Sequence, residues 1–351
     1  MLLLLFVRFA LSPIVTSMVN RRLAELPDHT GKVEAVHLAL WRGTVEVENF
    51  TLFTRKSPED GPVAHVPRAW FSFDWGPLLR GKLGAEARID DARLTIYNDV
   101  AIPEDEKSEA QKHEERGGKA EQIGEWQAEL REAFPMEISR AELRDARLRL
   151  VDRTVEPHPE AVLQQVQLVA TGLRNRHEPR DQQTDNLPAR VTFQAVVESG
   201  GSVTVDLRAD PIAEMPRFEV SMQILALQLP PLNGFVRAYA DSVVESGQFE
   251  LFTEITAEGG GYKGYLKPFF EELDFRAERD EDLVRKAVTA IASAAASVLE
   301  NEDDKTATVV PIEGNFTDNE VDIWTTVRNL LRNAFVQAFR EGFGTSRAAT
   351  E

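Results

Sequence analysis

Apolar and polar residues alternate along most of the chain between Gly31 and about Leu266. A period of two sends successive side chains to opposite faces of a strand, so each such segment has one face to bury and one to solvate. Glycine and proline turns between the segments favour antiparallel connections. The pattern predicts a mainly β protein with some helix, built on a long twisted antiparallel sheet. The clearest strand segments are residues 191–197, 203–209, 218–226 and 249–257.

A short internal repeat supports this interpretation. Residues 89–96 and 143–150 share the sequence Asp-Ala-Arg-Leu, and after the alanine the apolar residues alternate in both copies. Such self-similarity predicts that like units extend one sheet. Chance similarity between two strand edges is the alternative.

Helical periodicity is confined to a few segments. Residues 121–134, 282–299 and 322–343 carry apolar residues at helical spacing. For the two C-terminal helices the pattern favours core packing over a partner-binding or membrane-binding face. Composition divides the chain into an N-terminal helix (1–26), an N-terminal β region (27–98), an acidic insertion with a short amphipathic helix (99–134), a C-terminal β region with two closing helices (135–345) and a tail (346–351).

The N-terminal segment is strongly apolar. Residues 2–19 contain a single charged residue, Arg8, and approach the minimum length of a membrane-spanning helix. They lack the small-residue cleavage site of a signal peptide. We therefore expect a membrane anchor or an interfacial helix, with a buried first helix of a soluble domain as the alternative. The predicted anchor residues are Leu2, Leu5, Phe6, Phe9, Ile14 and Val15.

Charge and composition exclude several classes of protein. The chain has 40 Lys and Arg against 58 Asp and Glu, a formal net charge of −18, which repels phosphate backbones and excludes nucleic acid as a main partner. The absence of cysteine excludes a thiol nucleophile, disulfides and cysteine-bound metal. Neither the histidine spacing nor any short motif indicates a metal site, a phosphate loop or a catalytic serine. We predict a non-enzyme without cofactor or metal.

The apolar faces of the strands exceed what the predicted helices can cover. About twelve strands face three sizeable helices, and soluble monomers rarely expose an apolar patch larger than a few hundred Å². Either the sheet folds on itself as a sandwich or barrel, or its face is a groove for a ligand with long apolar chains. The candidate groove residues, all on the apolar phase of neighbouring strands, are Phe193, Val205, Val220, Ile224 and Leu251.

Both ends of the chain resemble one protein family. Residues 19–26, residues 31–47 with Trp41-Arg42-Gly43, and residues 70–83 with Trp70-Phe71-Ser72-Phe73-Asp74-Trp75 resemble the start of AsmA-like proteins of the bacterial envelope. Residues 261–270 and 311–335 resemble the C-terminal part of a compact, poorly characterised subgroup of that family.

The resemblance implies an anchor in the inner membrane, a body in the periplasm and a repeating β-groove with an apolar inner face. It implies a function in holding or relaying phospholipid, or another acyl-chain ligand, in support of outer-membrane biogenesis or intermembrane lipid transport. It supplies no catalytic residue. The alternative is a structural module of the cell envelope with a closed β-sandwich core and no lipid cargo, which recruits envelope proteins by strand addition.

Overall fold

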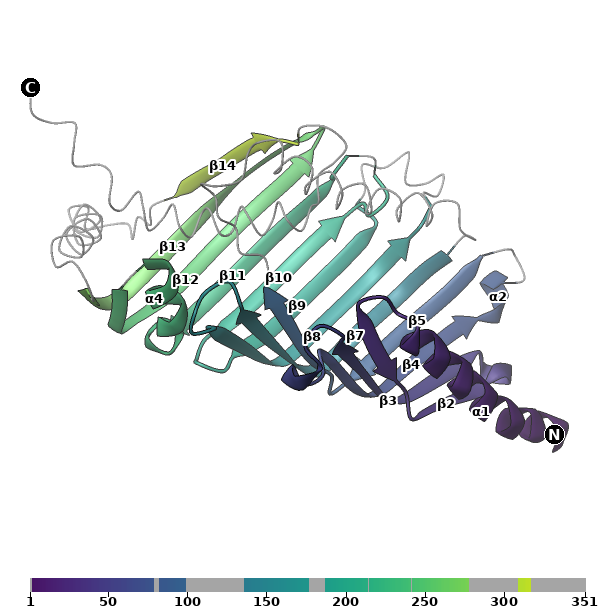
Figure 1. The fold of residues 1–351 in the computed structure, drawn as a ribbon. Coiled ribbons are helices and arrows are strands. Elements are labelled where there is room, and N and C mark those ends of the chain that lie inside the picture. Colours follow the sequence, from purple (N-terminus) through teal and green to yellow (C-terminus); the bar gives the residue numbers. More distant parts are fainter. Residues whose placement is uncertain are drawn as a thin grey trace, which may run out of the picture.

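One 14-stranded sheet runs through all the ranges that the computed structural model describes, which are residues 2–78, 82–98, 136–176, 187–213, 215–240, 242–277 and 309–316. The order along the sheet is β1-β3-β4-β5-β7-β8-β9-β10-β11-β12-β13-β14, with β2 beside β3 and β6 beside β4 and β7. Figure 1 shows the strands side by side along the length of the molecule, with helix α1 at one end. The prediction of a mainly β protein with helix is confirmed.

The elements have the following bounds. The first part of the sheet contains β1 (His29–Lys32), β2 (Ala35–Ala39), β3 (Thr44–Thr54), β4 (Ala64–Asp74), β5 (Leu83–Asp90), β6 (Arg93–Asn98), β7 (Met136–Asp152) and β8 (Glu160–Arg174). The second part contains β9 (Ala189–Val197), β10 (Ser202–Ala209), β11 (Phe218–Gln228), β12 (Ser242–Glu258), β13 (Gly261–Ala277) and β14 (Val310–Asn315). The helices are α1 (Leu2–Ala24), α2 (Trp75–Leu78) and α4 (Asn233–Ala240), and the 3-10 turns are η1 (Leu40–Arg42), η2 (Pro58–Asp60) and η3 (Pro230–Leu232).

The sheet is mixed, which corrects the expectation of a wholly antiparallel one. Strands β5 and β6 both pair with β7 in parallel, whereas the other neighbouring pairs are antiparallel. A parallel neighbour requires a long crossover connection, and residues 99–135 lie between β6 and β7. The internal repeat accounts for the register, because Ile89 pairs with Leu143 and Leu94 pairs with Leu148. The two copies therefore lie side by side in one sheet.

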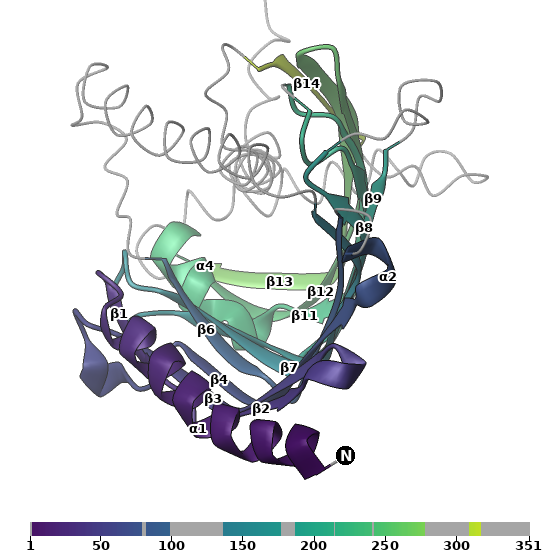
Figure 2. The same ribbon diagram turned by 90° about the vertical axis from the view of Figure 1, so that its right-hand side faces the viewer.

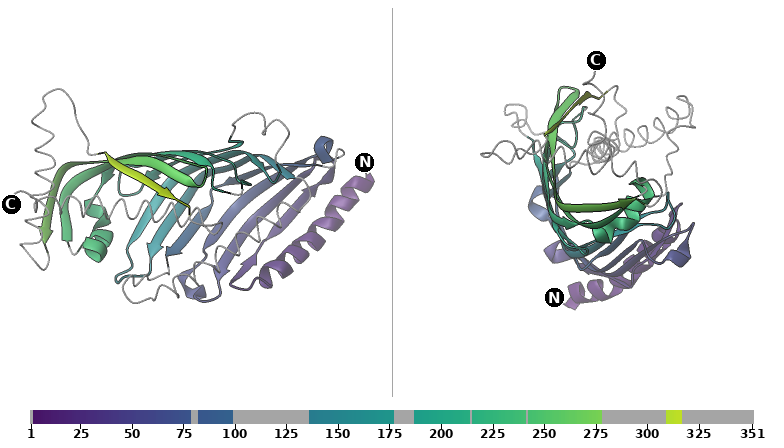
Figure 3. Two further views of the ribbon diagram at one scale, coloured as in Figure 1. Left: turned by 90° about the horizontal axis from the view of Figure 1, so that it is seen from above. Right: turned by 90° about the vertical axis from the view of Figure 1, so that its left-hand side faces the viewer.

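A series of backbone irregularities bends the sheet. Within the strands, or between β5 and β6, six non-glycine residues have a positive φ angle of 49° to 58°. Pairing slips by one residue beside several of them, as in a β-bulge, and bulges bend a strand and increase its twist. Figure 2 and the right-hand view in Figure 3 show the result, a sheet curved into a concave and a convex side. The six residues are Asn49, Asp91, Asp145, Gln165, Ala226 and Glu272.

The bulges also keep the apolar side chains on one side of the sheet. In a strand without a bulge, an inserted residue would turn every side chain beyond it to the other face of the sheet. In β7 the apolar phase passes from Leu143 to Ala146 across the bulge at Asp145, and in β11 it passes from Ile224 to Leu227 across Ala226. A spacing of three in place of two thus marks each bend.

Buried apolar side chains gather in three clusters. The first joins small residues of the first part of the sheet and β9, namely Val66, Ala69, Ala92, Ala146, Val166 and Ala195. The second lies between β11, β12, β13 and α4 and contains Leu229, Val244, Phe249, Leu251 and Leu266. The third contains Phe218, Ile255, Ala257 and Phe316.

Two helices bind the sheet through asparagine side chains. On α1, Asn20 accepts a hydrogen bond from the Val33 amide at 2.7 Å and donates one to the Val33 carbonyl at 3.0 Å. On α4, Asn233 makes the same pair of bonds with Val244, at 2.8 and 2.9 Å. A carboxamide offers one acceptor and one donor, so it substitutes for the pairing of a neighbouring strand.

Several sequence predictions fall outside the described residues. These are the acidic insertion at residues 99–119 and the helices over residues 121–134, 282–299 and 322–343.

Candidate functional site

A row of apolar residues crosses the sheet at equivalent positions of successive strands. Residues paired directly across neighbouring strands point to the same face, so the strand register defines the row without further assumption. We call this set the central row. From β2 to β13 it contains Val36, Val47, Ala69, Ile89, Leu143, Leu168, Phe193, Val205, Met222, Thr253 and Leu266.

Thr253 is the one polar member of the central row. It is 3% exposed, and its hydroxyl donates a hydrogen bond to the Tyr265 carbonyl at 2.7 Å. A buried hydroxyl with a backbone partner carries no unpaired polar group. The row is therefore apolar in effect throughout, and its ten spacings of about 4.8 Å give a length of about 48 Å.

All five residues predicted from the sequence lie on this same face. Phe193 of β9 is directly opposite Val205 of β10, and Ile224 of β11 is directly opposite Leu251 of β12. Val220 lies two residues from Met222 along β11 and so points to the same side. Sequence reasoning missed the first part of the row, from Val36 to Leu168, where the bulges in β3, β7 and β8 interrupt the alternation.

Helix α4 identifies the apolar face as the inside of the curve. Val236 of α4 packs against the cluster that includes Leu251 and Leu266. Figure 2 shows α4 on the concave side of the sheet. We call the surface that carries the central row the concave face.

The concave face differs in coverage along its length. Under α4, Leu251 is 9% exposed and Val244 is 1% exposed. Phe193, Val205 and Val220 are only half-buried. All the described strands belong to one sheet, so within these ranges no second sheet packs over those three side chains.

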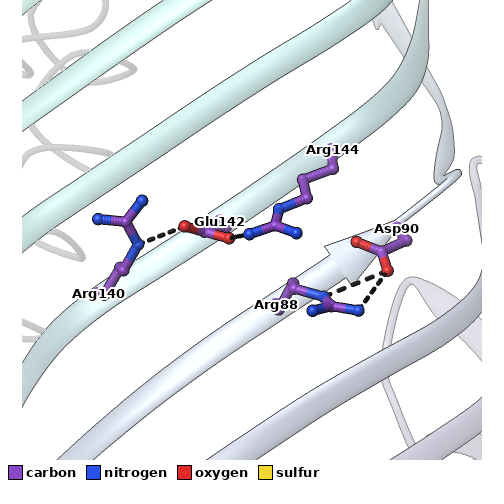
Figure 4. A network of polar contacts seen from close by, with 5 residues as sticks. All are labelled: Arg88, Asp90, Arg140, Glu142 and Arg144. Atoms are coloured by element: carbon purple, nitrogen blue, oxygen red, sulfur yellow. Dashed lines mark hydrogen bonds and ion pairs between the residues drawn. The ribbon is translucent and has the colours of Figure 1, made fainter.

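The opposite, convex face carries ion pairs. Figure 4 shows the carboxylate of Glu142 between the guanidinium groups of Arg140 and Arg144, with Arg88 paired to Asp90 on the neighbouring strand. The hydrogen bond from Arg140 is the main cause of a lowered pKa for Glu142; burial opposes it, and Arg144 adds to it. Glu142 is thus held ionised, and the charged side chains of these strands lie away from the concave face.

A flat aromatic ring extends this polar surface. Trp70 of β4 lies opposite Arg88 of β5, whose guanidinium is 4.4 Å from the ring centroid. The guanidinium of Arg68 approaches the same ring at 5.4 Å. Stacked cations of this kind stabilise exposed aromatic rings by about 0.5–1 kcal/mol. The convex face is therefore an ordered, solvated surface.

The described residues contain neither a candidate metal site nor a membrane-spanning helix. No group of three or more His, Asp or Glu side chains suited to a metal ion occurs in the described ranges. Among the described helices, none combines the length and the apolar character needed to cross a membrane. Of the predicted anchor residues, Ile14 is 62% exposed and Val15 is half-buried on α1. Leu2, Leu5, Phe6 and Phe9 lie in the same helix, and only their backbone is described.

Comparison with known proteins does not place the chain. No protein-family model matches it, and no curated protein matches it. The resemblance to AsmA-like proteins stays a prediction, and so do the absence of catalysis and the location in the envelope.

Proposed function

We propose that this chain is a non-enzymatic, AsmA-like envelope protein that holds or relays phospholipid along its concave face. The central row is the single observation that carries the proposal. An unbroken apolar line across eleven strands suits hydrocarbon, because burying an acyl chain there removes apolar surface of both partners from water at about 25 cal/mol per Å².

The uncovered part of the row sets the capacity of the face. From Ile89 to Met222 its members are half-buried, and the five spacings of about 4.8 Å give about 24 Å. A bilayer core of about 30 Å allots about 15 Å to the acyl chains of each leaflet, so this stretch accommodates at least one acyl chain along its length. The ion pairs of Glu142 and Asp90 on the convex face also support this proposal, since a charge among the acyl chains would cost several kcal/mol.

The proposed setting is the bacterial envelope. The apolar sequence of α1 anchors the chain at the inner membrane, the body lies in the periplasm, and the protein supports outer-membrane biogenesis or lipid transport between the two membranes. The sequence resemblance and the apolar residues 2–11 are the support for this setting.

Photo-crosslinking in cells tests the cargo. A photoreactive amino acid replaces Phe193 or Val205 on the concave face, and the matched controls are the exposed neighbours Gln194 and Thr204 on the other side of the same strands. We expect lipid adducts at the two concave positions only, identified by mass spectrometry of the purified protein. Equal capture at all four positions, or capture at none, would contradict a lipid-holding face.

A second candidate function is recruitment of envelope proteins by strand addition. Strand β14 pairs only with residues 261–266 of β13, and within the described ranges no strand pairs with the outer side of residues 267–277. An edge of this kind is a template for an added strand. The candidate predicts that amide hydrogen exchange at residues 267–277 slows in an envelope extract relative to the pure protein. Unchanged exchange would exclude it.

A further inference from the structure

Two exposed tryptophans share one corner of the sheet. Trp41 lies in η1, between β2 and β3, and is 46% exposed; Trp75 opens α2, between β4 and β5, and is 47% exposed. The two turns adjoin, because the Phe73 amide donates a hydrogen bond to the Gly43 carbonyl at 2.6 Å. We call Trp41, Arg42 and Trp75 the tryptophan corner.

The close approach of these turns depends on a glycine. Gly43 has a φ angle of +63°, and a Cβ there would lie 2.2 Å from the Phe73 carbonyl oxygen and 3.2 Å from Nε1 of Trp75. Only glycine tolerates both the backbone angle and the contact. The local structure therefore holds together the two turns that carry these half-exposed apolar rings, although water contact is unfavourable for both rings.

Helix α1 runs toward this corner. Asn20 binds Val33 and Thr16 accepts a hydrogen bond from the Val36 amide at 2.9 Å, so α1 is antiparallel to the edge strand. Strand β2 continues past His37 to η1, so the N-terminal turns of α1 extend toward η1. Figures 1 and 3 show the N-terminal end of α1 and helix α2 at the same end of the sheet.

The N-terminal turns of α1 have the composition of a membrane-inserted segment. Residues 2–11 are apolar except for Arg8. At 1.5 Å per residue these ten residues measure about 15 Å, the thickness of the hydrocarbon of one leaflet. Arginine at this depth reaches the headgroup level through its long side chain. Exposed tryptophan prefers that same level, because its ring is apolar and its N–H is polar.

We propose that the tryptophan corner docks on the surface of a phospholipid bilayer. Residues 2–11 of α1 insert into the facing leaflet, Trp41 and Trp75 lie at the headgroup level, and Arg42 contacts lipid phosphates. The proposal rests on the proposed function only for the presence of a membrane, and it needs no lipid on the concave face. The exposed carboxylate of Asp74 beside the corner lessens any preference for anionic lipids.

Vesicle flotation of the full chain tests the docking surface. With phosphatidylcholine vesicles, we expect Trp41→Ala with Trp75→Ala to lower the partition coefficient about tenfold, because two apolar anchors are lost. The matched control is Trp70→Ala, which removes a tryptophan from the convex face and should leave partitioning unchanged. Equal partitioning of the wild type and the double variant would overturn the proposal.

Fluorescence gives a second measurement that does not depend on weakened binding. Phosphatidylcholine with brominated acyl chains quenches tryptophans that touch the bilayer. The conservative variant Trp41→Phe with Trp75→Phe should lose most of the quenching seen in the wild type, whereas Trp70→Phe should retain it. Undiminished quenching in the double variant would exclude contact at the corner.

Lipid analysis of the same variants separates this proposal from the proposed function. The double variants should retain co-purified lipid, because Phe193 lies on β9, several strands away from the corner along the sheet. Vesicle docking without co-purified lipid in any variant would contradict only the lipid-holding face. A changed oligomeric state in sedimentation, with unchanged docking, would assign the corner to contacts between copies and overturn the membrane proposal.

Discussion

The concave face is covered at one end and half-exposed in the middle. Under α4, the cluster around Leu251 buries leucine and phenylalanine side chains against Val236. At β9 and β10 the same face presents Phe193 and Val205 half-buried. Both regions have the same alternation in the sequence. The difference teaches that α4 covers the apolar face where it lies, and that the described part of the structure leaves apolar area in the middle of the face partly exposed.

The largest expected effect comes from a charge in the covered region. Leu251→Asp places a carboxylate where the side chain is 9% exposed and packed beneath α4. Burying an unpaired charge costs several kcal/mol, a large fraction of the stability of a typical protein. We expect loss of soluble folded protein or a strongly lowered melting temperature, measured by circular dichroism. Near wild-type stability would show that α4 does not seal this end.

The matched substitution in the middle should behave differently. Val205→Asp puts the same charge on the same face, but water reaches the half-buried position. We expect folding with a destabilisation of about 1–2 kcal/mol, well below the cost of full burial, together with loss of co-purified lipid. Unfolding equal to that of Leu251→Asp would show that the middle of the face is closed to water, and would contradict an open lipid-holding face.

Removal of an asparagine tests how α4 is held. Asn233→Ala leaves the amide and carbonyl of Val244, a residue 1% exposed, without these partners. We expect a loss of about 2–4 kcal/mol in urea unfolding, near the cost of two unpaired buried groups. Asn20→Ala should cost a similar amount, about 2–4 kcal/mol, because Val33 is 2% exposed and loses the same two partners. The exposed Ser17→Ala on α1 is the control, and an equal loss there would point to helix propensity.

The smallest effect should arise on the convex face. The hydrogen bond from Arg140 lowers the pKa of Glu142. Ionised Glu142 therefore stabilises the folded state at pH values above the ordinary pKa of a glutamate. That contribution disappears as the pH falls through the lowered value. Glu142→Gln should therefore reduce stability slightly at pH 7 and leave the variant level with wild type in strong acid, measured by melting temperature against pH. A constant difference at all pH values would exclude the ion pairs as its cause.

Part of this architecture could be predicted from residue patterns. The alternation in residues 191–257 identified strands β9 to β12 and placed Phe193, Val205, Val220, Ile224 and Leu251 on one face. β9 and β10 pair without register shifts, and β9 to β11 are joined by short connections, so pattern and register agree. The use of that face for lipid stays a proposal.

The remaining features depend on contacts that no local pattern specifies. The parallel pairing of β5 with β7 depends on a crossover through residues 99–135, although the repeat at Ile89 and Leu143 marks its register. The asparagines on α1 and α4 look like ordinary surface residues until Val33 and Val244 are brought beside them. The bulges were visible only as apolar spacings of three, which a search for strict alternation treats as noise.

The bulges make the width of this molecule independent of its length. Inserted residues recur along the sheet, as at Asp145 of β7 and Ala226 of β11, so the curvature is encoded locally within individual strands. Adding a hairpin whose two strands carry such a residue would lengthen the sheet by about 10 Å and preserve the curve. A chain of this design can therefore be tuned to the distance it must cover simply by counting strands.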